Sequence, residues 1–409
     1  MDNIKNVPSI RFDGYDDDWD ITTFSDEVKI FRGLTYNPSN LSDYGSGIRV
    51  LRSSNIKNDV FVLNDDDVFV DRSAINITYA KNGNILITAA NGSTNLVGKH
   101  AIVDKLKLNS TVHGGFMLLG EAKEPYFINA LMGSNWYKDF IMQKVSGGNG
   151  AIGNLKKSDF DNEILHIPSK NEQAQIGNFF KNIDEKLELE KEKHQKLVNF
   201  KKAMLDDMFP KEGERTPKIR IEGFDDEWNI NIVDSIFILN QGIQVPIDKQ
   251  FTIQEKNMDR FIRIIDLTNN KEKPRYIKAV INKNVYVSEE DLFMVRYGTP
   301  GKIGFGFKGI IANNMFRLIP RTKTKLNTKF FNYYFESLES TIFSKSISSS
   351  MPAISFSVLK KCNISHPSLE EQGLIGNFFK NLDEKIEISE KKIEKIENFK
   401  KAMLDKMFV

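Results

Sequence analysis

Basic, hydroxyl and amide side chains stand where apolar segments run into polar or glycine-rich turns. Such groups bind phosphate oxygens and the edges of nucleic-acid bases. The same residue types also form ordinary turns, so no single one is diagnostic; only their recurrence at matched places in both halves favours binding. The candidates are Arg32, Thr35, Arg49, Arg52, Asn91 and Lys99 in the first half, and Arg263, Arg296, Thr299 and Lys302 in the second.

The motifs of the common catalytic sites are missing. No GxSxG, HExxH or cysteine–histidine metal pattern occurs, and the five histidines are scattered singly. The GTPGK stretch at 298–302 lacks the spacing of a phosphate-binding loop, and EPYF at 124–127 differs from the Asn-Pro-Pro-Tyr type motif of an amino-methyltransferase. We therefore expect no catalytic residues and no metal site in this chain.

Bulk properties predict a cytoplasmic protein of two or three domains. The 409 residues carry a net charge of +2, and 40% of them are hydrophobic. The first residues, MDNIKNVPS, hold no apolar run typical of a secretory signal, and the one cysteine, Cys362, excludes internal disulfides. A near-neutral net charge argues neither for nor against nucleic acid, because a local basic face would be hidden in the sum.

The elements that position these turns come in two copies. NFFKNIDEKLELEKEKHQKLVNFKKAMLDDMF at 178–209 recurs at 377–408 with 21 of 32 positions identical. VPSIRFDGYDDDWD at 7–20 recurs as TPKIRIEGFDDEWN at 216–229. The middles, about 20–150 and 229–352, share little sequence, and both have the mixed patterning of α/β structure. The two halves thus have similar end segments and dissimilar middle segments. This pattern is explained if one repeated scaffold presents two different surfaces.

Each repeated C-terminal segment predicts one long helix with a heptad seam. Such a seam needs a partner helix, and the other copy is the obvious one. We expect His194 to set the register, opposite Ser389, rather than to bind a metal, with Glu190 opposite Ile393. The seam residues are Ile183, Leu187, His194, Leu197 and Met204 in the first copy, and Leu382, Ile386, Ile393, Ile396 and Met403 in the second.

The chain resembles the specificity subunits of type I restriction-modification enzymes (the HsdS family). The resemblance is carried by IRFDGYDDDW and IRIEGFDDEW and by the two helices with IGNFFKN(I/L)DEK and NFKKAMLD(D/K)MF, and it covers the whole chain. It implies two globular α/β target recognition domains, joined by two long antiparallel coiled-coil helices in a pseudo-twofold tandem repeat. The implied boundaries are 1–170 and 211–368 for the recognition domains, and 171–210 and 369–409 for the helices.

The resemblance also implies a function. Each recognition domain would read one half of a bipartite, asymmetric DNA target, while the helices would set the spacer and dock two methyltransferase subunits. Up to two motor-nuclease subunits would complete the complex. The chain itself would be non-catalytic and bind no cofactor, because S-adenosylmethionine, ATP and Mg²⁺ belong to the partner subunits.

A glycine turn typical of the family adds further candidates for DNA contact. The Gly-x-Thr turn is kept as Gly33 and Thr35, whereas the second copy reads QGIQ, with Gln241 before the glycine and Gln244 in place of threonine. That replacement puts the phosphate contact in doubt in the second copy. Two other classes of function remain open: a coiled-coil adaptor with no DNA role, and a methyltransferase fused to its own reader.

Overall fold

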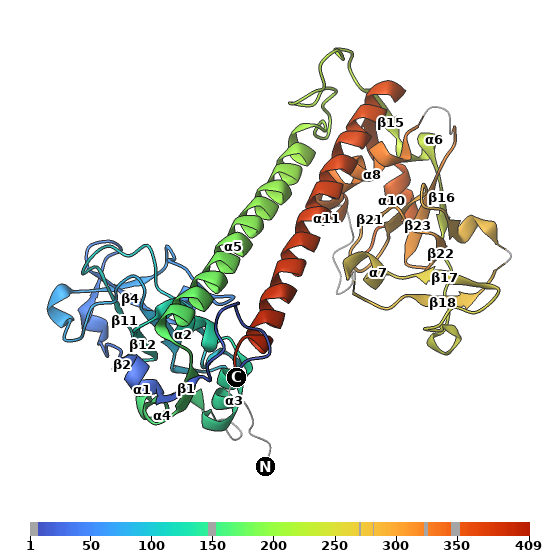
Figure 1. The fold of residues 1–409 in the computed structure, drawn as a ribbon. Helices are drawn as coiled ribbons and strands as arrows, with labels where there is room; N and C mark the ends of the chain where they lie inside the picture. The colour runs from blue at the N-terminus through green and yellow to red at the C-terminus, as the bar shows by residue number, and fades with distance from the viewer. Residues whose placement is uncertain (1–6, 146–152, 270, 281, 323–325, 345–351) are drawn as a thin grey trace. The chain divides into compact units, whose positions relative to one another are not determined.

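The computed structural model describes residues 7–145, 153–269, 271–280, 282–322, 326–344 and 352–409. The chain forms two compact units, 1–191 with 391–409, and 192–390. Each unit therefore contains one middle segment together with parts of both long helices. The unit boundaries fall inside the helices α5 (Lys170–Asp207) and α11 (Leu369–Lys406), which are 38 residues each (Figure 1).

The first unit contains two four-stranded sheets. One is antiparallel, in the order β10 (His100–Ile102), β8 (Ile85–Thr88), β12 (Met117–Ala122), β2 (Val28–Arg32). The other has the order β11 (Thr111–His113), β4 (Ile48–Leu51), β7 (Val68–Val70), β3 (Leu41–Ser42), with β11 parallel to β4. Smaller pairs are β1 (Asp20–Thr23) with β14 (Ile164–Ile167), β9 (Ala90–Asn91) with β13 (Gly153–Asn154), and β5 (Ile56–Lys57) with β6 (Val60–Phe61). The short helices are α1 (Phe24–Glu27), α2 (Pro125–Leu131), α3 (Asn135–Lys144) and α4 (Lys157–Asp161).

The second unit repeats this plan although the two middles share little sequence. Its antiparallel sheet has the order β16 (Phe237–Gln241), β23 (Met315–Pro320), β20 (Leu292–Val295), β21 (Ile303–Gly304). The other sheet has the order β18 (Arg275–Lys278), β17 (Met258–Ile262), β22 (Gly309–Ile311), β19 (Tyr286–Val287), with β17 parallel to β22. β15 (Asn229–Ile232) pairs with β24 (Asn363–His366), and the short helices are α6 (Val233–Ile236), α7 (Ile264–Thr268), α8 (Thr328–Ser337), α9 (Glu339–Ser344) and α10 (Phe356–Lys360).

The ends of the long helices are built into the cores. In the first unit Phe408, just after α11, packs against Trp19 and Phe127 with ring centroids 6.3 and 5.7 Å away. In the second unit Phe209 makes the matching contacts, 6.3 Å to Trp228 and 5.7 Å to Phe330. Burial of such large rings is the main favourable term in folding, so each core is completed by a helix end.

The duplicated N-terminal motif is anchored to the same places in each unit. The Arg11 guanidinium donates to both carboxylate oxygens of Glu172 at 2.7 and 2.8 Å, and Arg220 does the same to Glu371 at 2.9 Å for both bonds. The backbone N–H of Ile10 donates to the carbonyl of Lys406, as that of Ile219 donates to Asp207, each at 2.9 Å. The motif thus joins the start of one long helix to the end of a long helix.

The long helices pair antiparallel inside each unit. In the first, Asp184 lies 2.5 Å from Lys400 and Glu190 lies 2.7 Å from Lys392, so residue numbers fall along α11 as they rise along α5. In the second, Lys201 lies 2.8 Å from Asp383. This pair corresponds to Lys400 and Asp184 of the first unit, because each residue is shifted by 199 positions. No helix in the described ranges has the length and hydropathy needed to cross a membrane.

Candidate DNA-recognition faces

Three turns converge at one end of the antiparallel sheet in the first unit. They follow β2 (residues 33–35), follow β8 and include the two-residue strand β9 (89–92), and join β11 to β12 (114–116). The Leu34 N–H donates to the His113 carbonyl at 2.7 Å, and the N–H groups of Ala89 and Ala90 both donate to the Phe116 carbonyl, at 2.9 and 3.1 Å. Backbone hydrogen bonds therefore hold the three turns together.

Gly33 permits the closest of these contacts. A Cβ atom at this position would lie 1.9 Å from the Gly114 carbonyl oxygen, well inside van der Waals distance. Gly242 has the same role in the second unit, where a Cβ would lie 2.2 Å from the Ala312 oxygen. The glycine of the repeated turn is thus required because two backbones touch there.

The converging turns of the first unit border a cavity of about 840 Å³ with mainly apolar walls. Thr35, Arg52 and Asn91 line it, which brings three of the predicted residues together. The Asn91 amide donates to the Ser53 hydroxyl at 3.0 Å, and Arg52 donates to the Asp66 carbonyl at 3.1 Å. Hydroxyl, amide and guanidinium groups around an apolar hollow can hold a nucleotide by hydrogen bonds and by stacking.

The same three turns meet in the second unit but carry different side chains. Gln241 donates through its amide to the Asn313 carbonyl at 2.8 Å, and the Tyr297 hydroxyl lies 3.2 Å from Asn313 Oδ1. The Asn313 amide in turn lies 3.5 Å from Gln244 Oε1. This cluster of amides offers both donors and acceptors, the groups that distinguish base edges in the major groove.

Other predicted residues lie outside these faces or are engaged within the unit. Arg49 forms an ion pair with buried Asp67 and stacks on Phe69, and Arg263 is held by Asp266 and Glu272 at 3.1 and 3.4 Å. Lys99 and Lys302 line cavities beside the long helices instead. Arg32 and Thr299 are exposed, and the guanidinium of Arg296 lies over the Phe316 ring.

Two residues of the faces were not predicted from the sequence. Phe116 is 73% exposed at the rim of the apolar cavity, where a large ring has no packing role. Asn313 occupies the same turn in the second unit and connects the amide cluster. The sequence could have indicated these two residues, because HGGFM at 113–117 and IANNM at 311–315 are short turns that lead into corresponding strands. Two further stretches of small residues, SGGNG at 146–150 and SISSSMP at 346–352, are also predicted as loops from the sequence, and apart from Pro352 they lie outside the described residues.

His113 lies directly beneath the first face and is fully buried. Its Nε2 lies 3.2 Å from the Phe31 carbonyl, and burial lowers the pKa of the imidazole from 6.5 to about 4. Below pH 6.5 the unfolded chain therefore binds a proton that the folded unit does not, and stability decreases as the pH falls.

We expect this histidine to reduce the free energy of unfolding by about 3 kcal/mol between pH 6.5 and pH 4. The measurement is urea unfolding across this range, for the natural protein and for His113→Asn. The variant removes the titrating group, so its stability should fall less steeply on acidification. Equal slopes for the two proteins would contradict this assignment.

The predicted seam residues are buried or half-buried along both long helices. Glu190 is 6% exposed and forms its ion pair with Lys392, next to the predicted Ile393. His194 Nδ1 and the Ser389 hydroxyl are buried without a hydrogen-bond partner in the described part of the chain. Polar atoms in such a seam lower stability but can restrict the register.

The described residues contain no cluster of three or more histidine, cysteine or carboxylate side chains that could hold a metal ion. The two faces themselves present hydrogen-bond donors, acceptors and aromatic or apolar surface at one end of a sheet.

Comparison with known proteins agrees with this architecture. A specificity subunit of the type I restriction enzyme MjaVIII from Methanocaldococcus jannaschii is 28% identical over 135 residues, which is 33% of this chain. The match spans only 31% of that relative's length. The solved S subunit of a type I restriction-modification system from M. genitalium aligns over 98% of this chain and 99% of its own, with a TM-score of 0.62 and 14% identity.

A second solved structure comes from work on complex assembly and conformational transition of the type I restriction-modification system. It aligns over 93% of this chain and 97% of its own, with a TM-score of 0.51 and 16% identity. Residues 16–199 and 198–398 each match the family described as type I restriction modification DNA specificity domain. The chain belongs to this family and contains two copies of its domain.

Proposed function

We propose that this chain is the DNA-specificity subunit of a type I restriction-modification complex and that each unit reads one half of a bipartite target. The observation that carries the proposal is the pair of faces, each built from three turns. The two faces have the same backbone arrangement but differ in nearly every side chain. The first face combines a cavity with Thr35, Arg52 and Phe116, whereas the second presents the amides of Gln241 and Asn313. Different side chains on one frame would select different base sequences.

The chain is non-catalytic in this proposal. Methyl transfer, with its S-adenosylmethionine, and any ATP- and Mg²⁺-dependent cleavage belong to partner subunits. The groups that the faces do present, hydroxyl, amide, guanidinium and aromatic side chains, are those of recognition.

Exchange of one middle segment tests the proposal. Residues 20–150 should be replaced by the corresponding segment of a relative and the chain expressed with its methyltransferase subunit. We expect sequencing of methylated DNA to show a change in one half of the target and an unchanged second half. A change in both halves would contradict independent reading, and salt-independent or absent DNA binding by the natural complex would favour the adaptor alternative.

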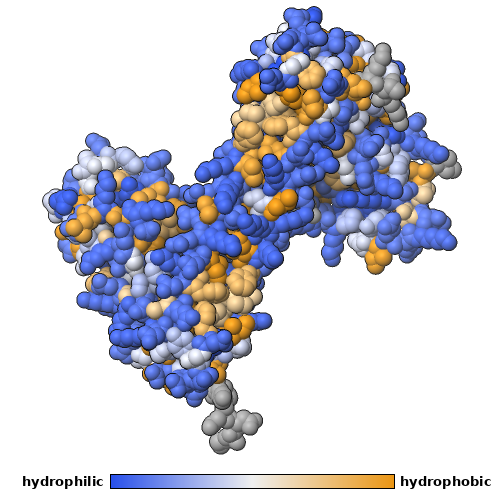
Figure 2. Space-filling view, turned by 45° about the horizontal axis from the view of Figure 1, so that its top comes forward, coloured by the Kyte–Doolittle hydropathy of each residue, from blue (hydrophilic) through white to orange (hydrophobic). Residues whose placement is uncertain are grey.

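The long helices also expose apolar residues at matched positions, and these support docking of two identical partners. Leu189 and Ile388 are 50% and 66% exposed, and Phe200 and Phe399 are 47% and 48% exposed, each pair at the offset of 199. Figure 2 shows apolar patches set among the mostly hydrophilic surface of the face in view. Exposed apolar groups repeated by symmetry are typical of interfaces with a repeated subunit. We assign them to two methyltransferase subunits.

We expect Phe200→Ala and Phe399→Ala each to weaken binding of one methyltransferase subunit and the double variant to weaken both. Loss of an aromatic contact at the centre of an interface costs about 2 kcal/mol or more, roughly a thirtyfold loss of affinity. Both rings are half-exposed, so the chain should keep its thermal stability. Analytical ultracentrifugation with purified subunits gives the stoichiometry, and an unchanged 2:1 complex with the double variant would remove these residues from the interface.

A further inference from the structure

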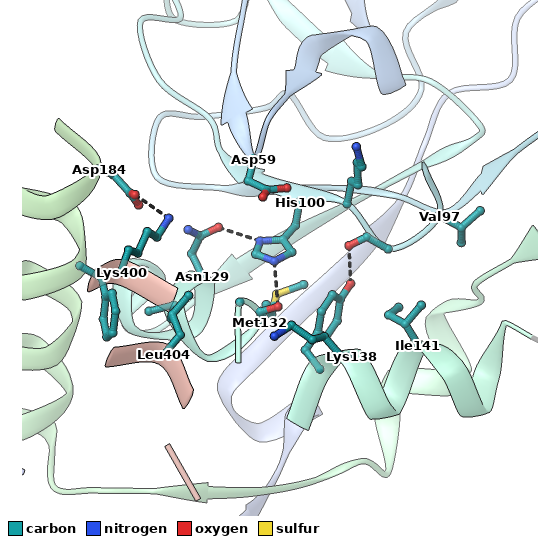
Figure 3. Close-up of a pocket in the computed structure, with 16 residues that line it drawn as sticks. Asp59, Val97, His100, Asn129, Met132, Lys138, Ile141, Asp184, Lys400 and Leu404 are labelled. Atoms are coloured by element: carbon teal, nitrogen blue, oxygen red, sulfur yellow. Dashed lines mark hydrogen bonds and ion pairs between the residues drawn. The ribbon is translucent and has the colours of Figure 1, made fainter. Parts of the chain in front are cut away.

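The first unit holds a cavity of about 360 Å³ between α2, α3 and the long helices. Figure 3 shows His100 at its centre, 2.9 Å from Asn129 and 3.0 Å from the Met132 carbonyl, with the Asp184–Lys400 pair at one side and Leu404 below. This volume lies within the range of about 300–1,000 Å³ that is typical of small-molecule sites. It is separate from the DNA-recognition face.

The second unit shows what belongs in this space. Phe127 and Phe330 occupy equivalent places, because each lies 5.7 Å from the matching phenylalanine of a helix end, Phe408 or Phe209. Counting three and six residues onward from each, Ala130 corresponds to Tyr333 and Gly133 corresponds to Glu336. Both Ala130 and Gly133 line the cavity of the first unit. The first unit therefore lacks the aromatic ring and the carboxylate that Tyr333 and Glu336 provide in the second unit.

These two side chains have specific partners in the second unit. The Tyr333 ring stacks on Phe379 at 5.0 Å, and its hydroxyl donates to Asp383 at 2.7 Å. Glu336 accepts from Lys201 at 2.8 Å, and Lys201 also binds Asp383. Lysine, aspartate and phenylalanine are all kept in the first unit as Lys400, Asp184 and Phe180, and all three line the cavity.

We propose that the cavity of the first unit binds a phenolic carboxylate in the space that Tyr333 and Glu336 fill in the second. The ring lies beside Phe180 and Leu404, the phenol donates to Asp184, and the carboxylate accepts from Lys400. Among the described residues Lys400 has Asp184 as its one carboxylate partner, whereas Lys201 has two. A ligand carboxylate would restore the second ion pair.

The charges around the cavity of each unit make the site specific to the first unit. Its cavity is lined by Lys99, Lys138 and Lys400 against Asp59 and Asp184. With Tyr333 packed on Phe379, the second unit keeps a different cavity of about 390 Å³, which is lined by Tyr333 itself and by four carboxylates and one lysine: Asp266, Glu336, Glu339, Asp383 and Lys302. An organic anion is attracted to the first and repelled by the second, so the second unit is a built-in control.

Calorimetric titration of the full chain with 3-hydroxyphenylacetate tests the proposal. We expect one molecule to bind per chain, and 3-ethylphenol, which keeps the ring and hydroxyl but has no charge, to bind at least about tenfold more weakly. Absence of binding at millimolar concentration would overturn the proposal, as would two equivalent sites per chain or equal affinity for the two probes.

Three variants locate the site. Ala130→Tyr introduces the aromatic ring that the second unit has at this place and should abolish probe binding. The double variant Ala130→Tyr with Gly133→Glu should also abolish binding, and its new carboxylate should form a second ion pair with Lys400. A Cβ at Gly133 would lie 3.1 Å from the Ala130 carbonyl oxygen and 3.2 Å from the end of the Leu404 side chain, so shifts of a few tenths of an ångström accommodate it and both variants should fold. Lys400→Met should weaken the acid at least about tenfold and leave 3-ethylphenol unaffected. Unchanged binding in all three variants would place the probe elsewhere and overturn the assignment.

The ligand chemistry has two possible sources, a free acid or an aromatic and acidic segment of a partner subunit. Repeating the titration with the methyltransferase subunit bound distinguishes them. Unchanged probe binding identifies a free acid as the occupant. Competition identifies side chains of the partner, and both results uphold the chemistry of the site. The proposal does not depend on DNA recognition, since the titration contains no DNA.

Discussion

Replacing Arg11 with alanine should lower the free energy of unfolding by about 3–5 kcal/mol. The Glu172 side chain is fully buried, and Arg11 donates to both of its oxygens. Removal of the guanidinium leaves a carboxylate in the interior without its counter-charge, which costs more than the pair itself contributes. Arg220→Ala should have the same effect in the second unit, because Glu371 is equally buried. Chemical denaturation measured for the full chain gives both values.

A matched control separates burial from charge. Arg215 and Glu227 form a pair at 3.3 Å in which both side chains are more than half exposed. Arg215→Ala should therefore change the unfolding free energy by at most about 1 kcal/mol. Changing Arg11 and Glu172 together to apolar residues should recover most of the loss, since no unpaired charge remains. If Arg11→Ala and Arg215→Ala proved equally mild, the buried pair would have no special role.

Gly33→Ala should abolish reading of one half of the DNA target and leave the other half intact. The added methyl would lie 1.9 Å from a backbone oxygen, so the turns at 33–35 and 114–116 have to separate. Overpacking of this kind costs about 1–3 kcal/mol, and displacement of the turn also moves Thr35 and Phe116. Gly242→Ala should have the corresponding effect on the second half.

Gly92→Ala is the control on the same face, because a Cβ there meets no atom within 4 Å. Sequencing of methylated DNA from cells that carry each variant reports both halves at once. We expect Gly92→Ala to retain the whole target. Loss of both halves with Gly33→Ala would mean that the damage spreads through the chain and that the units do not read independently.

The repeats and the α/β class could be predicted from the sequence because they depend on local patterns. The long helices follow from a heptad spacing that no proline interrupts, and the structure has them as Lys170–Asp207 and Leu369–Lys406. The pattern of the segment 261–269 is typical of a strand with a polar exit, but the strand ends at Ile262 and α7 begins at Ile264. Its capping aspartate, Asp266, accepts from the Arg263 N–H at 2.8 Å and favours the helix.

The site residues were harder to predict because their roles depend on contacts between distant segments. Arg49 was a candidate for DNA contact by residue type and position, yet it neutralises Asp67, which directly precedes the neighbouring strand β7. Phe116 has no apolar periodicity around it, and only its 73% exposure beside a cavity distinguishes it from a core residue. Residue type and turn position can nominate such residues, but the partner that engages each one is set by the fold.

The chain segments that make up each unit also have a consequence for synthesis on the ribosome. The second unit is continuous in sequence, from 192 to 390, whereas the first needs residues 391–409 to complete it. The first 191 residues thus emerge early but lack Leu404, Met407 and Phe408 of their core until residues 391–409 have also been made. The half of the protein that is made first is therefore the half that finishes folding last. Its apolar surface stays open while the second unit is being made, which gives chaperones a defined window of action on the nascent chain.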